Sequence, residues 1–284
     1  MKSIINYYYK MYPLDIIKNN NIYFFEDKNI KYEFKEINID PNNLLEIYYL
    51  IRNTNLYCHE IILNILGEFI TNYNNHMYIL LKTNIKKKIS IEDINTYSIP
   101  LNINSNLKWK TFWEERIDYY EYQLLELNLD KKLESFDYYI GLSETAIQIL
   151  NYIDEKNIFY SFGHKTFDDY YDPLNIIISP RIRDMVEYLK YLFFNKSISN
   201  TELIQILDNF VLINNLNKDE ILLMIARFLY PSYYFNEYDN YLQNIKYDFD
   251  FIIKKSSEYE LLIKQIYNKY KDIYNLINIE WLIN

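Results

Sequence analysis

The sequence predicts an α+β protein with a small antiparallel-sheet lobe at residues 1–84 and a larger, mostly helical lobe at residues 85–284. Two observations predict this class. Strand-forming segments separated by turn residues dominate the first 82 residues. From about residue 107 onward, apolar residues recur at three- and four-residue steps, which is typical of amphipathic helices. The polar and basic stretch 84–90 separates the two regions, and 284 residues suffice for two lobes with a sizeable core.

The N-terminal lobe should contain two pairs of strands with a helix between them. A short helix precedes the first pair and is stopped by Pro13. The turn at 27–29 joins the first pair of strands, and the Asn-rich turn at 72–76 joins the second. The expected elements are a helix at 1–12, strands at 21–26 and 30–37, a helix at 44–52, and strands at 61–71 and 77–82.

The C-terminal lobe should consist mainly of helices that pack aromatic side chains inward. The helix 107–127 carries an aromatic stripe that favours a core face over a ligand-binding box; its members include Trp109, Phe112, Trp113 and Tyr120. Ser199 and Glu202 fit a capping box at the start of a later helix. The other expected helices lie at 139–153, from Asp184, at 203–207, 219–229, 233–245 and 247–275.

A strand, a polar loop and a second strand interrupt the helical part. The first strand, 158–162, ends in Gly163 and His164, and the second spans 173–178. Ser179-Pro180 then breaks the chain before the helix that begins at Asp184. Two short strands with polar groups between them are a common way to present reactive side chains. The candidate functional residues are therefore sought in this loop.

The charge and composition exclude several classes of function. The net charge of −9 and pI of about 5.0 argue against nucleic-acid binding, which needs a basic surface. The single cysteine, Cys58, excludes an internal disulfide framework and a cysteine zinc cluster. The three scattered histidines have no metal-ligand spacing. No apolar run approaches the length of a membrane span, and the N-terminus is too polar for a signal peptide, so a cytoplasmic protein is expected.

Tyrosine is heavily over-used, with 33 residues. Together with frequent Asn, Ile and Lys, this most simply reflects an AT-rich genome. A tyrosine-rich surface that serves protein assembly is the second interpretation, because tyrosine offers a large contact area at low entropic cost.

The order of these elements resembles a bilobal protein-kinase-like fold. The details are most similar to its aminoglycoside-phosphotransferase branch and, within it, to the kinase-like spore coat proteins of the CotS/YutH type. The segments that carry this resemblance span nearly the whole chain: YYYKMYP, NIYFFE, WKTFWEERIDYYE, YYIGLSETAIQIL, SPRIRDMVEYLKY, ARFLYPSYYF and IEWL. The resemblance implies partners among spore coat or sporulation proteins and incorporation into the coat.

The resemblance also implies roles for individual residues. Working members bind nucleotide phosphates with a lysine on the third strand, which pairs with a helix glutamate. Lys35 and Glu46 match these two positions, although an exposed strand lysine and a solvated helix glutamate are an equally good interpretation. His164 matches the histidine that holds the catalytic loop together. Asp184 matches an aspartate that braces this loop, and it is also a candidate cap for its helix.

The catalytic groups of the family pattern are missing from their expected positions. Thr166 stands where the loop aspartate should be, and Tyr171 where the asparagine should be. Ser179 follows the second strand where a magnesium-binding aspartate is expected, and a neutral serine is a poor replacement for a carboxylate ligand. The sequence therefore predicts no metal ligand. The nearby Asp168, Asp169 and Asp172 are either shifted catalytic carboxylates or, as we favour, solvated loop residues.

These observations predict a catalytically degenerate kinase-like protein, a pseudokinase, that acts in protein assembly without a cofactor. The alternative is an active small-molecule phosphotransferase that uses ATP and magnesium, with Lys35 on the phosphates and two of the three loop aspartates as base and metal ligand. A third hypothesis is nucleotide binding without turnover, which Lys35 and Glu46 would permit.

Overall fold

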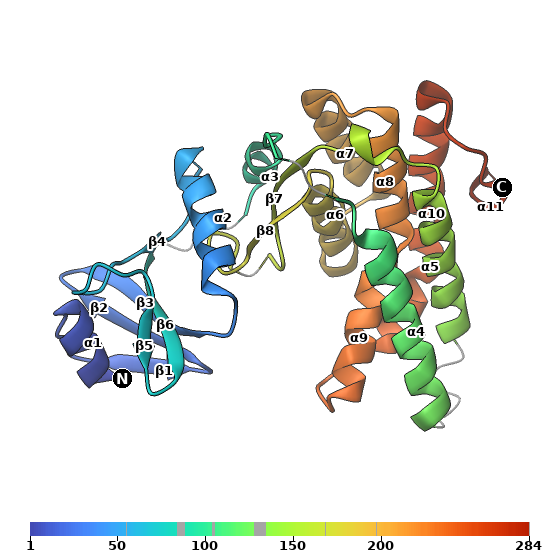
Figure 1. Ribbon diagram of the computed structural model, residues 1–284. Helices are drawn as coiled ribbons and strands as arrows, with labels where there is room; N and C mark the ends of the chain where they lie inside the picture. The colour runs from blue at the N-terminus through green and yellow to red at the C-terminus, as the bar shows by residue number, and fades with distance from the viewer. Residues whose placement is uncertain are drawn as a thin grey trace. The chain divides into compact units, whose positions relative to one another are not determined.

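The computed structural model of the chain describes residues 1–54, 56–83, 89–103, 106–127, 135–167, 169–196 and 198–283. The chain forms two compact units (Figure 1). The first comprises Met1–Asp93 and His164–Ile178, and the second comprises Ile94–Gly163 and Ser179–Asn284. The loop segment with the candidate aspartates thus belongs to the same unit as the N-terminal sheet. The predicted α+β class, a small antiparallel sheet followed by a larger helical part, is confirmed.

The N-terminal unit is built on an antiparallel sheet with the strand order β1-β2-β3-β6-β4, and β5 pairs with β6. Its elements are α1 (Lys2–Tyr9), β1 (Ile16–Asn19), β2 (Ile22–Asp27), β3 (Ile30–Ile37), α2 (Pro41–Asn53), β4 (Glu60–Ile61), β5 (Thr71–Tyr73) and β6 (His76–Thr83). The predicted strands at 30–37 and 77–82 agree with β3 and β6, whereas β1 has no counterpart in the prediction. One further helix, α3 (Ile91–Tyr97), begins at the end of this unit.

Asparagine and lysine take the place of glycine in the hairpin turns. Lys28 and Asn29 have φ values of 51° and 62° between β2 and β3, and Asn74 and Asn75 have 51° and 64° between β5 and β6. Two consecutive residues with positive φ are the geometry of a tight hairpin turn that matches the twist of the strands. Asparagine tolerates this left-handed backbone better than most residues, which suits a chain with three glycines.

The two faces of the sheet have different roles because successive side chains of a strand point to opposite sides. One face carries Phe25, Tyr32 and Phe34 and packs with Ile5 and Tyr9 of α1 in a buried cluster. Figure 1 shows α1 beside the strands of this sheet. On β3, the intervening residues Glu33 and Lys35 therefore point to the other face, and both are nevertheless buried.

The predicted strand at 61–71 is wrong. Strand structure is present at its two ends, in β4 and β5, and residues 62–70 form a loop. Asn64 causes the difference, since its Oδ1 accepts hydrogen bonds from the backbone N–H groups of Leu66 and Glu68, at 2.9 and 3.1 Å. Side-chain bonds of this kind compete with sheet pairing. Gly67, with φ of 78°, completes the turn.

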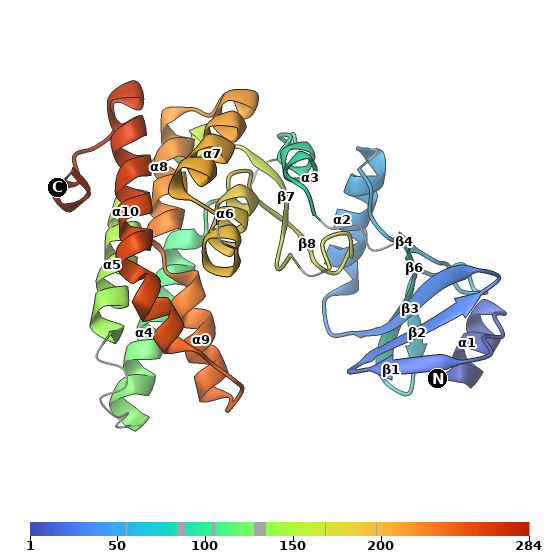
Figure 2. The same cartoon turned by 180° about the vertical axis from the view of Figure 1, so that it is seen from behind.

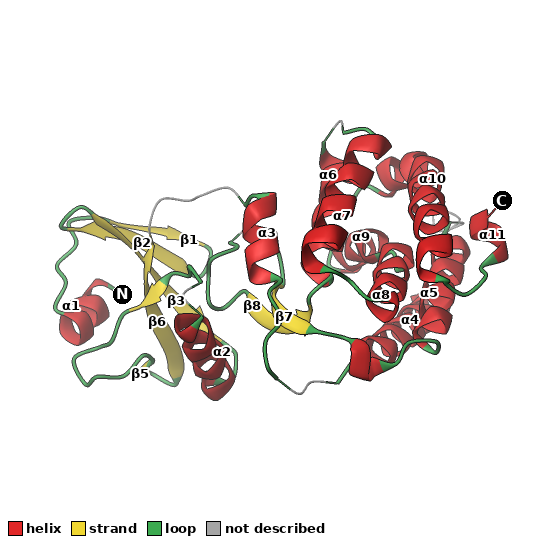
Figure 3. Ribbon diagram, turned by 90° about the horizontal axis from the view of Figure 1, so that it is seen from above, coloured by secondary structure: helices red, strands yellow, loops and turns green. Residues whose placement is uncertain are grey.

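The C-terminal unit is mostly helical, and its long helices pack side by side (Figures 2 and 3). Its further helices are α4 (Trp109–Leu127), α5 (Phe136–Leu150), α6 (Arg183–Asn195), α7 (Asn200–Asn214), α8 (Lys218–Leu229), α9 (Ser232–Leu242), α10 (Phe249–Tyr274) and α11 (Glu280–Ile283). The apolar helix α8 is buried almost throughout and packs against α5, α6 and α10. The predicted capping box of Ser199 and Glu202 is confirmed at the start of α7. Among the described residues, no helix is long and apolar enough to cross a bilayer.

The aromatic stripe of α4 is largely a core face, as predicted. Trp109, Trp113 and Tyr120 are buried, and the ring of Trp113 stacks on Tyr230 with 4.3 Å between centroids. Phe112 is the exception, because 56% of it is exposed. It precedes Trp113 by one residue, and one residue turns the helix by about 100°, which places Phe112 outside the buried stripe.

Two short strands, β7 (Tyr160–His164) and β8 (Ile176–Pro180), frame the candidate loop and pair with each other. The division between the two units falls within this pair, after Gly163 and after Ile178. The predicted strand–loop–strand segment is confirmed, with both strands shifted by two to three residues toward the C-terminus.

Candidate functional site

Three carboxylates surround the ammonium group of Lys35 in the N-terminal unit. Its Nζ lies 2.6 Å from Oδ2 of Asp172, 2.7 Å from Oε2 of Glu33 and 3.0 Å from Oδ2 of Asp169. Lys35 is held in the middle of the sheet, since it faces Ile22 of β2 and Ile79 of β6 in the register. The side chains of Lys35, Glu33 and Asp172 are buried, and that of Asp169 is about one-third exposed. We call these four residues the Lys35 cluster.

The carboxylates more than offset the cost of burying the ammonium group. Burial alone would lower the pKa of Lys35, but Asp172 first, through its charge and its hydrogen bond, and then Glu33 raise it above the usual 10.5. With all four groups ionised, one positive and three negative charges give the cluster a net charge of −2. The surroundings of Lys35 therefore favour a cation and disfavour an incoming anion.

The β7–β8 loop that supplies Asp169 and Asp172 is held by its own hydrogen bonds. The amide of Asn175, directly before β8, accepts from the N–H of Thr166 at 2.9 Å and donates to the carbonyl groups of Thr166 and Asp169 at 2.7 and 3.1 Å. Oδ1 of Asp172 accepts from the N–H of Leu174 at 2.9 Å, which leaves Oδ2 for Lys35. Asn175 thus closes the loop and Asp172 links it to β3.

The structure changes the interpretation of Lys35 and Glu46. Lys35 is buried, so the interpretation as an exposed strand lysine is wrong. Glu46 lies on α2 and is exposed, as a solvated glutamate would be. Among the described residues, the carboxylates at ion-pair distance from Lys35 are Glu33, Asp169 and Asp172. Nucleotide binding by Lys35 and Glu46 stays a prediction.

Glu33 is the residue that sequence reasoning missed. Its position carries a signal, because residues two apart on a strand share a face, and Glu33 precedes Lys35 by two on β3. Of the three candidate aspartates, Asp169 and Asp172 are brought together at Lys35, and Asp168 lies outside the described residues. Asp172 is buried and ion-paired, so the interpretation as a solvated loop residue is wrong for it. A catalytic role for these aspartates stays a prediction.

His164 ends β7 and packs against the same loop. Its ring is buried and stacks on Tyr170, with 3.5 Å between the centroids. The carbonyl group of the adjacent Tyr171 accepts a hydrogen bond of 2.9 Å from the backbone N–H of His59. His164 thus packs on the loop through Tyr170, and the structural role that the resemblance implies for it stays a prediction.

Asp184 lies in the first turn of α6 in the C-terminal unit. The helix begins at Arg183 with Ile182 as its N-cap residue and without a side-chain cap, so the expected capping role of Asp184 is wrong. Its buried Oδ1 lies 3.1 Å from Nη1 of Arg183. An acidic residue in a first helical turn also interacts favourably with the helix dipole.

A glycine allows the backbone of β7 to approach Ser179 and Asp184. A Cβ atom built on Gly163 would lie 2.1 Å from Oγ of Ser179 and 3.2 Å from Oδ1 of Asp184. The first distance is far below van der Waals contact, so a side chain at residue 163 requires the serine or the strand to shift. Gly163 is therefore needed for this packing, which brings Asp184 next to β7.

We expect Gly163→Ala to destabilise the protein by about 1–3 kcal/mol, because overpacking a tight interior forces such shifts. Urea unfolding followed by circular dichroism measures the change. The double variant Gly163→Ala/Ser179→Gly removes the clashing hydroxyl group and should recover most of the loss. A single variant as stable as the wild type would show that this packing is loose.

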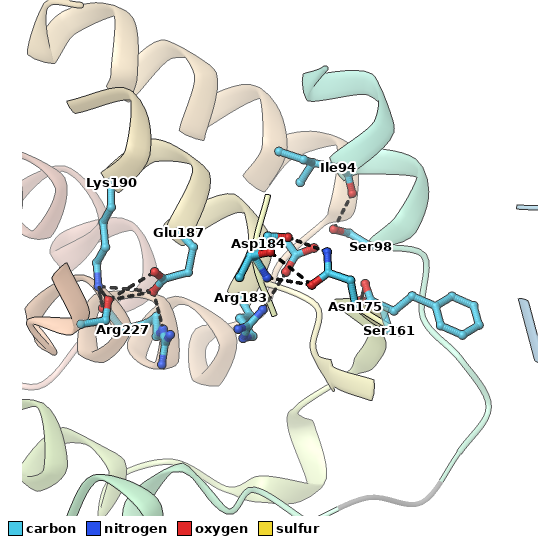
Figure 4. Close-up of polar contacts among 12 residues, drawn as sticks. Ile94, Ser98, Ser161, Asn175, Arg183, Asp184, Glu187, Lys190 and Arg227 are labelled. Carbon is cyan, nitrogen blue, oxygen red and sulfur yellow. Dashed lines mark hydrogen bonds and ion pairs between the residues drawn. The ribbon is translucent and has the colours of Figure 1, made fainter. Parts of the chain in front are cut away.

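A second network of charges lies between α6 and α8 (Figure 4). Glu187 accepts a hydrogen bond from Nε of Arg227 at 2.7 Å and lies 3.4 Å from Nζ of Lys190. Burial alone would raise the pKa of Glu187, but the charges of Arg227 and Lys190 lower it to about 2. Nζ of Lys190 also donates to the carbonyl groups of Arg227 and Tyr230, at 2.7 and 2.8 Å. Because its partners are groups of the protein itself, this network ties the helices together.

The residues present fit a bound magnesium ion poorly while Lys35 keeps its charge. Carboxylate oxygens are the ligands that magnesium prefers, and Asp169 and Asp172 supply them. Their Oδ2 atoms, however, already face the ammonium group of Lys35. Across the described part of the chain, no group of three or more His, Cys, Asp or Glu residues is arranged to hold a metal ion.

A pocket of about 830 Å³ lies beside the cluster in the N-terminal unit. It is lined in part by Ile17 and Phe24, by Lys31 and Glu33 of β3, and by Thr83 at the end of β6. Its volume is within the usual range for small-molecule sites. The pocket shares Glu33 with the Lys35 cluster, and the other three residues of the cluster are not among its lining residues.

Comparison with known sequences identifies the family. The family model described as "Spore coat putative kinase YutH" matches residues 2–266. The chain belongs to this spore coat family. It is 28% identical over 182 residues to the endospore coat-associated protein YutH of Bacillus subtilis (strain 168), a match that covers 54% of each chain. The chain thus aligns with about half the length of this curated relative.

Solved structures confirm the kinase-like fold. An aminoglycoside phosphotransferase from Alicyclobacillus acidocaldarius has a TM-score of 0.68 at 10% identity, covering 93% of this chain and 96% of that one. The amicoumacin kinase hAmiN, in complex with AMP-PNP and calcium, has a TM-score of 0.57 at 12% identity over 94% and 92% of the two chains. The choline kinase LicA from Streptococcus pneumoniae has 0.52 at 10% identity over 89% and 94%. At such identities the likeness concerns the fold alone.

Proposed function

We propose that this member of the YutH family is a pseudokinase that serves the assembly of the spore coat. The observation that carries the proposal is the Lys35 cluster, in which the lysine expected to bind phosphates is held by three carboxylates of its own chain. Under this proposal the protein binds other proteins inside the cell as a scaffold and is incorporated into the spore coat.

Nucleotide phosphates would have to compete with these carboxylates for Lys35. They are anionic, and the cluster already has a net charge of −2 when all its groups are ionised. Moving phosphates to Lys35 would leave Glu33 and Asp172, both buried, without their counterion. Breaking a buried ion pair in this way costs about 3–5 kcal/mol. Phosphoryl transfer depends on charges that are fixed in advance to stabilise the phosphates, and here the fixed charges oppose them.

The other groups of a phosphotransferase site are also changed. Thr166 and Ser179 stand at the positions expected for the loop aspartate and the metal aspartate. The amide of Asn175 is used within the loop, in its bonds to Thr166 and Asp169. Thr166 and Ser179 each lack the negative charge of the aspartate expected there, and Ser179 also lacks the carboxylate that would bind magnesium.

Release of the γ-phosphate of ATP tests the proposal. Purified protein with magnesium should release phosphate no faster than the Lys35→Met and Asp172→Asn variants. An activity of the wild-type protein that both substitutions reduce by about 100-fold or more would overturn it, since removal of one fixed charge from a catalytic site has an effect of this order.

The pocket beside Glu33 supports a second candidate, an ATP- and magnesium-dependent small-molecule phosphotransferase. In that function Lys35 would release Asp169 and Asp172 when nucleotide enters, and the two aspartates would serve as base and metal ligand. Nucleotide binding without turnover would use the same pocket. The phosphate-release assay distinguishes the active phosphotransferase from the pseudokinase and from nucleotide binding without turnover.

A further inference from the structure

The pocket on the N-terminal sheet joins a buried carboxylate to apolar side chains. The strands β1, β2 and β3 lie side by side (Figure 2). Ile17 of β1 faces Phe24 of β2 in the register, and Phe24 faces Glu33 of β3. Residues that face each other on neighbouring strands project to the same side of a sheet, so these three side chains form a row across the pocket that they line. We call it the Glu33 pocket.

The carboxylate of Glu33 has hydrogen-bonding capacity to spare. Only 3% of the residue is exposed, and buried carboxylates normally accept hydrogen bonds. Its Oε2 lies 2.7 Å from Nζ of Lys35, but among the described residues it accepts no well-aligned hydrogen bond. The ammonium group instead donates to Asp169 and Asp172, at 3.0 and 2.6 Å. Glu33 can therefore accept a further hydrogen bond from a donor in the pocket.

The other charges of the pocket lining offset one another. Glu26 and Lys31 face each other on β2 and β3, and Asp15 and Lys28 add one charge of each sign. All four residues are exposed, so solvent and salt screen their charges. Among the described lining residues, the buried carboxylate of Glu33 is therefore the excess charge, and the pocket as a whole is negative.

We propose that the Glu33 pocket binds a small organic cation, an amine whose ammonium group contacts Glu33 and whose apolar part lies over Phe24 and Ile17. Small-molecule sites typically combine apolar walls with a few placed polar groups. Neighbouring strands lie about 4.8 Å apart, so a ring above Phe24 is separated from Glu33 by about the length of a two-carbon link to an ammonium group. The pocket, of about 830 Å³, is large enough for such a molecule.

The charges favour a cation over a neutral or an anionic ligand. The Lys35 cluster, to which Glu33 belongs, has a net charge of −2 when all its groups are ionised. An incoming cation lowers the repulsion among these carboxylates, and an incoming anion raises it. A neutral ligand could use the apolar wall, but its hydrogen bond to Glu33 would lack the charge on the donor. Hydrogen bonds between two ionised groups are the shorter and stronger ones.

This inference adds a small-molecule ligand to the proposed scaffold protein. It uses the same cluster of charges as the pseudokinase proposal, so the two proposals need separate measurements. Amine binding is measured without nucleotide, and phosphate release is measured without amine. A protein that releases phosphate could still bind the amine, and a pseudokinase could lack the amine site, so failure of one proposal leaves the other standing.

Isothermal titration calorimetry of the full chain with phenethylamine at neutral pH tests the site. The wild type should bind it with a dissociation constant of about 1 mM or below, as a ligand of this size can. Phenethyl alcohol has the same ring and link without the charge and should bind about tenfold more weakly or worse, and the anion hydrocinnamate should bind more weakly still. Absence of amine binding would overturn the proposal, as would an alcohol or an anion that binds as tightly as the amine.

Variants of the two ends of the row locate the bound amine. Glu33→Gln keeps the size of the side chain and removes its charge, so it should weaken phenethylamine binding by about tenfold or more and leave phenethyl alcohol unaffected. Ile17→Lys places a cation in the apolar wall and should also weaken amine binding; this isoleucine is 69% exposed, so the variant should fold even if Glu33→Gln does not. The matched control is Glu36→Gln, on the other face of β3, which should bind like the wild type. Unchanged amine binding by either folded pocket variant would overturn the proposal.

Discussion

Lys35→Met should destabilise the protein by about 3–5 kcal/mol, which is the range for removing one partner of a buried ion pair. The substitution keeps most of the aliphatic side chain but removes the ammonium group that pairs with the buried carboxylates of Glu33 and Asp172. Asp169 would add to the repulsion. Urea unfolding monitored by circular dichroism gives the free energy of unfolding for both proteins.

Lys31→Met is the matched control, because Lys31 lies on the same strand and is exposed. It should change stability by no more than about 0.5 kcal/mol, as surface substitutions usually do.

The raised pKa of Lys35 also determines how the stability of the protein depends on pH. The stabilisation that it supplies is fully present below pH 10.5 and is lost as pH rises through its higher folded-state pKa. If Lys35→Met and Lys31→Met lowered the free energy of unfolding equally, Lys35 would contribute no more to stability than an ordinary surface lysine.

Arg181→Met should have an effect of similar size in the C-terminal unit. Nε and Nη2 of Arg181 each lie 2.6 Å from an oxygen of Glu220, and both side chains are buried. Glu220 also accepts a hydrogen bond from the N–H of Asn217 at the start of α8. Without the guanidinium group, the carboxylate is left buried and only partly compensated, which costs about 3–5 kcal/mol.

The double variant Arg181→Met/Glu220→Met separates the cost of an unpaired charge from the value of the pair. Replacing both partners by apolar residues of similar size is often neutral. We expect the double variant to be more stable than Arg181→Met alone, by about 2 kcal/mol once the lost capping bond of Glu220 is included. A double variant less stable than the single one would show that the pair itself, and not the unpaired carboxylate, dominates.

Much of the fold follows from local patterns in the sequence. The turn at 27–29 lies between two segments with β-forming residues, and the capping box at Ser199 precedes an apolar period, so β3 and α7 could be predicted from neighbouring residues alone. The loop at 62–70 could not, because its apolar residues resemble a strand. What decides its structure is the hydrogen bonding of Asn64, a contact pattern that composition does not encode.

The candidate site was harder to predict because its groups come from distant parts of the chain. Lys35 and Asp172 are 137 residues apart in sequence, and no local pattern links them. The resemblance directed attention to Glu46 as the partner of Lys35, and the strand period, which would have indicated Glu33, was not applied to β3. The spacing expected for a catalytic loop led to Tyr171, while the loop actually closes at Asn175, directly before β8.

The central claim is that the carboxylates of this chain occupy the lysine that would otherwise bind nucleotide. Its most direct test is the thermal unfolding midpoint with ATP and magnesium, each alone and together. A ligand at about 100 times its dissociation constant stabilises a native protein by about 2.7 kcal/mol. We predict no shift in any condition. A rise with ATP and magnesium together that Lys35→Met abolishes would contradict the claim, because it would show that Lys35 remains available to phosphates.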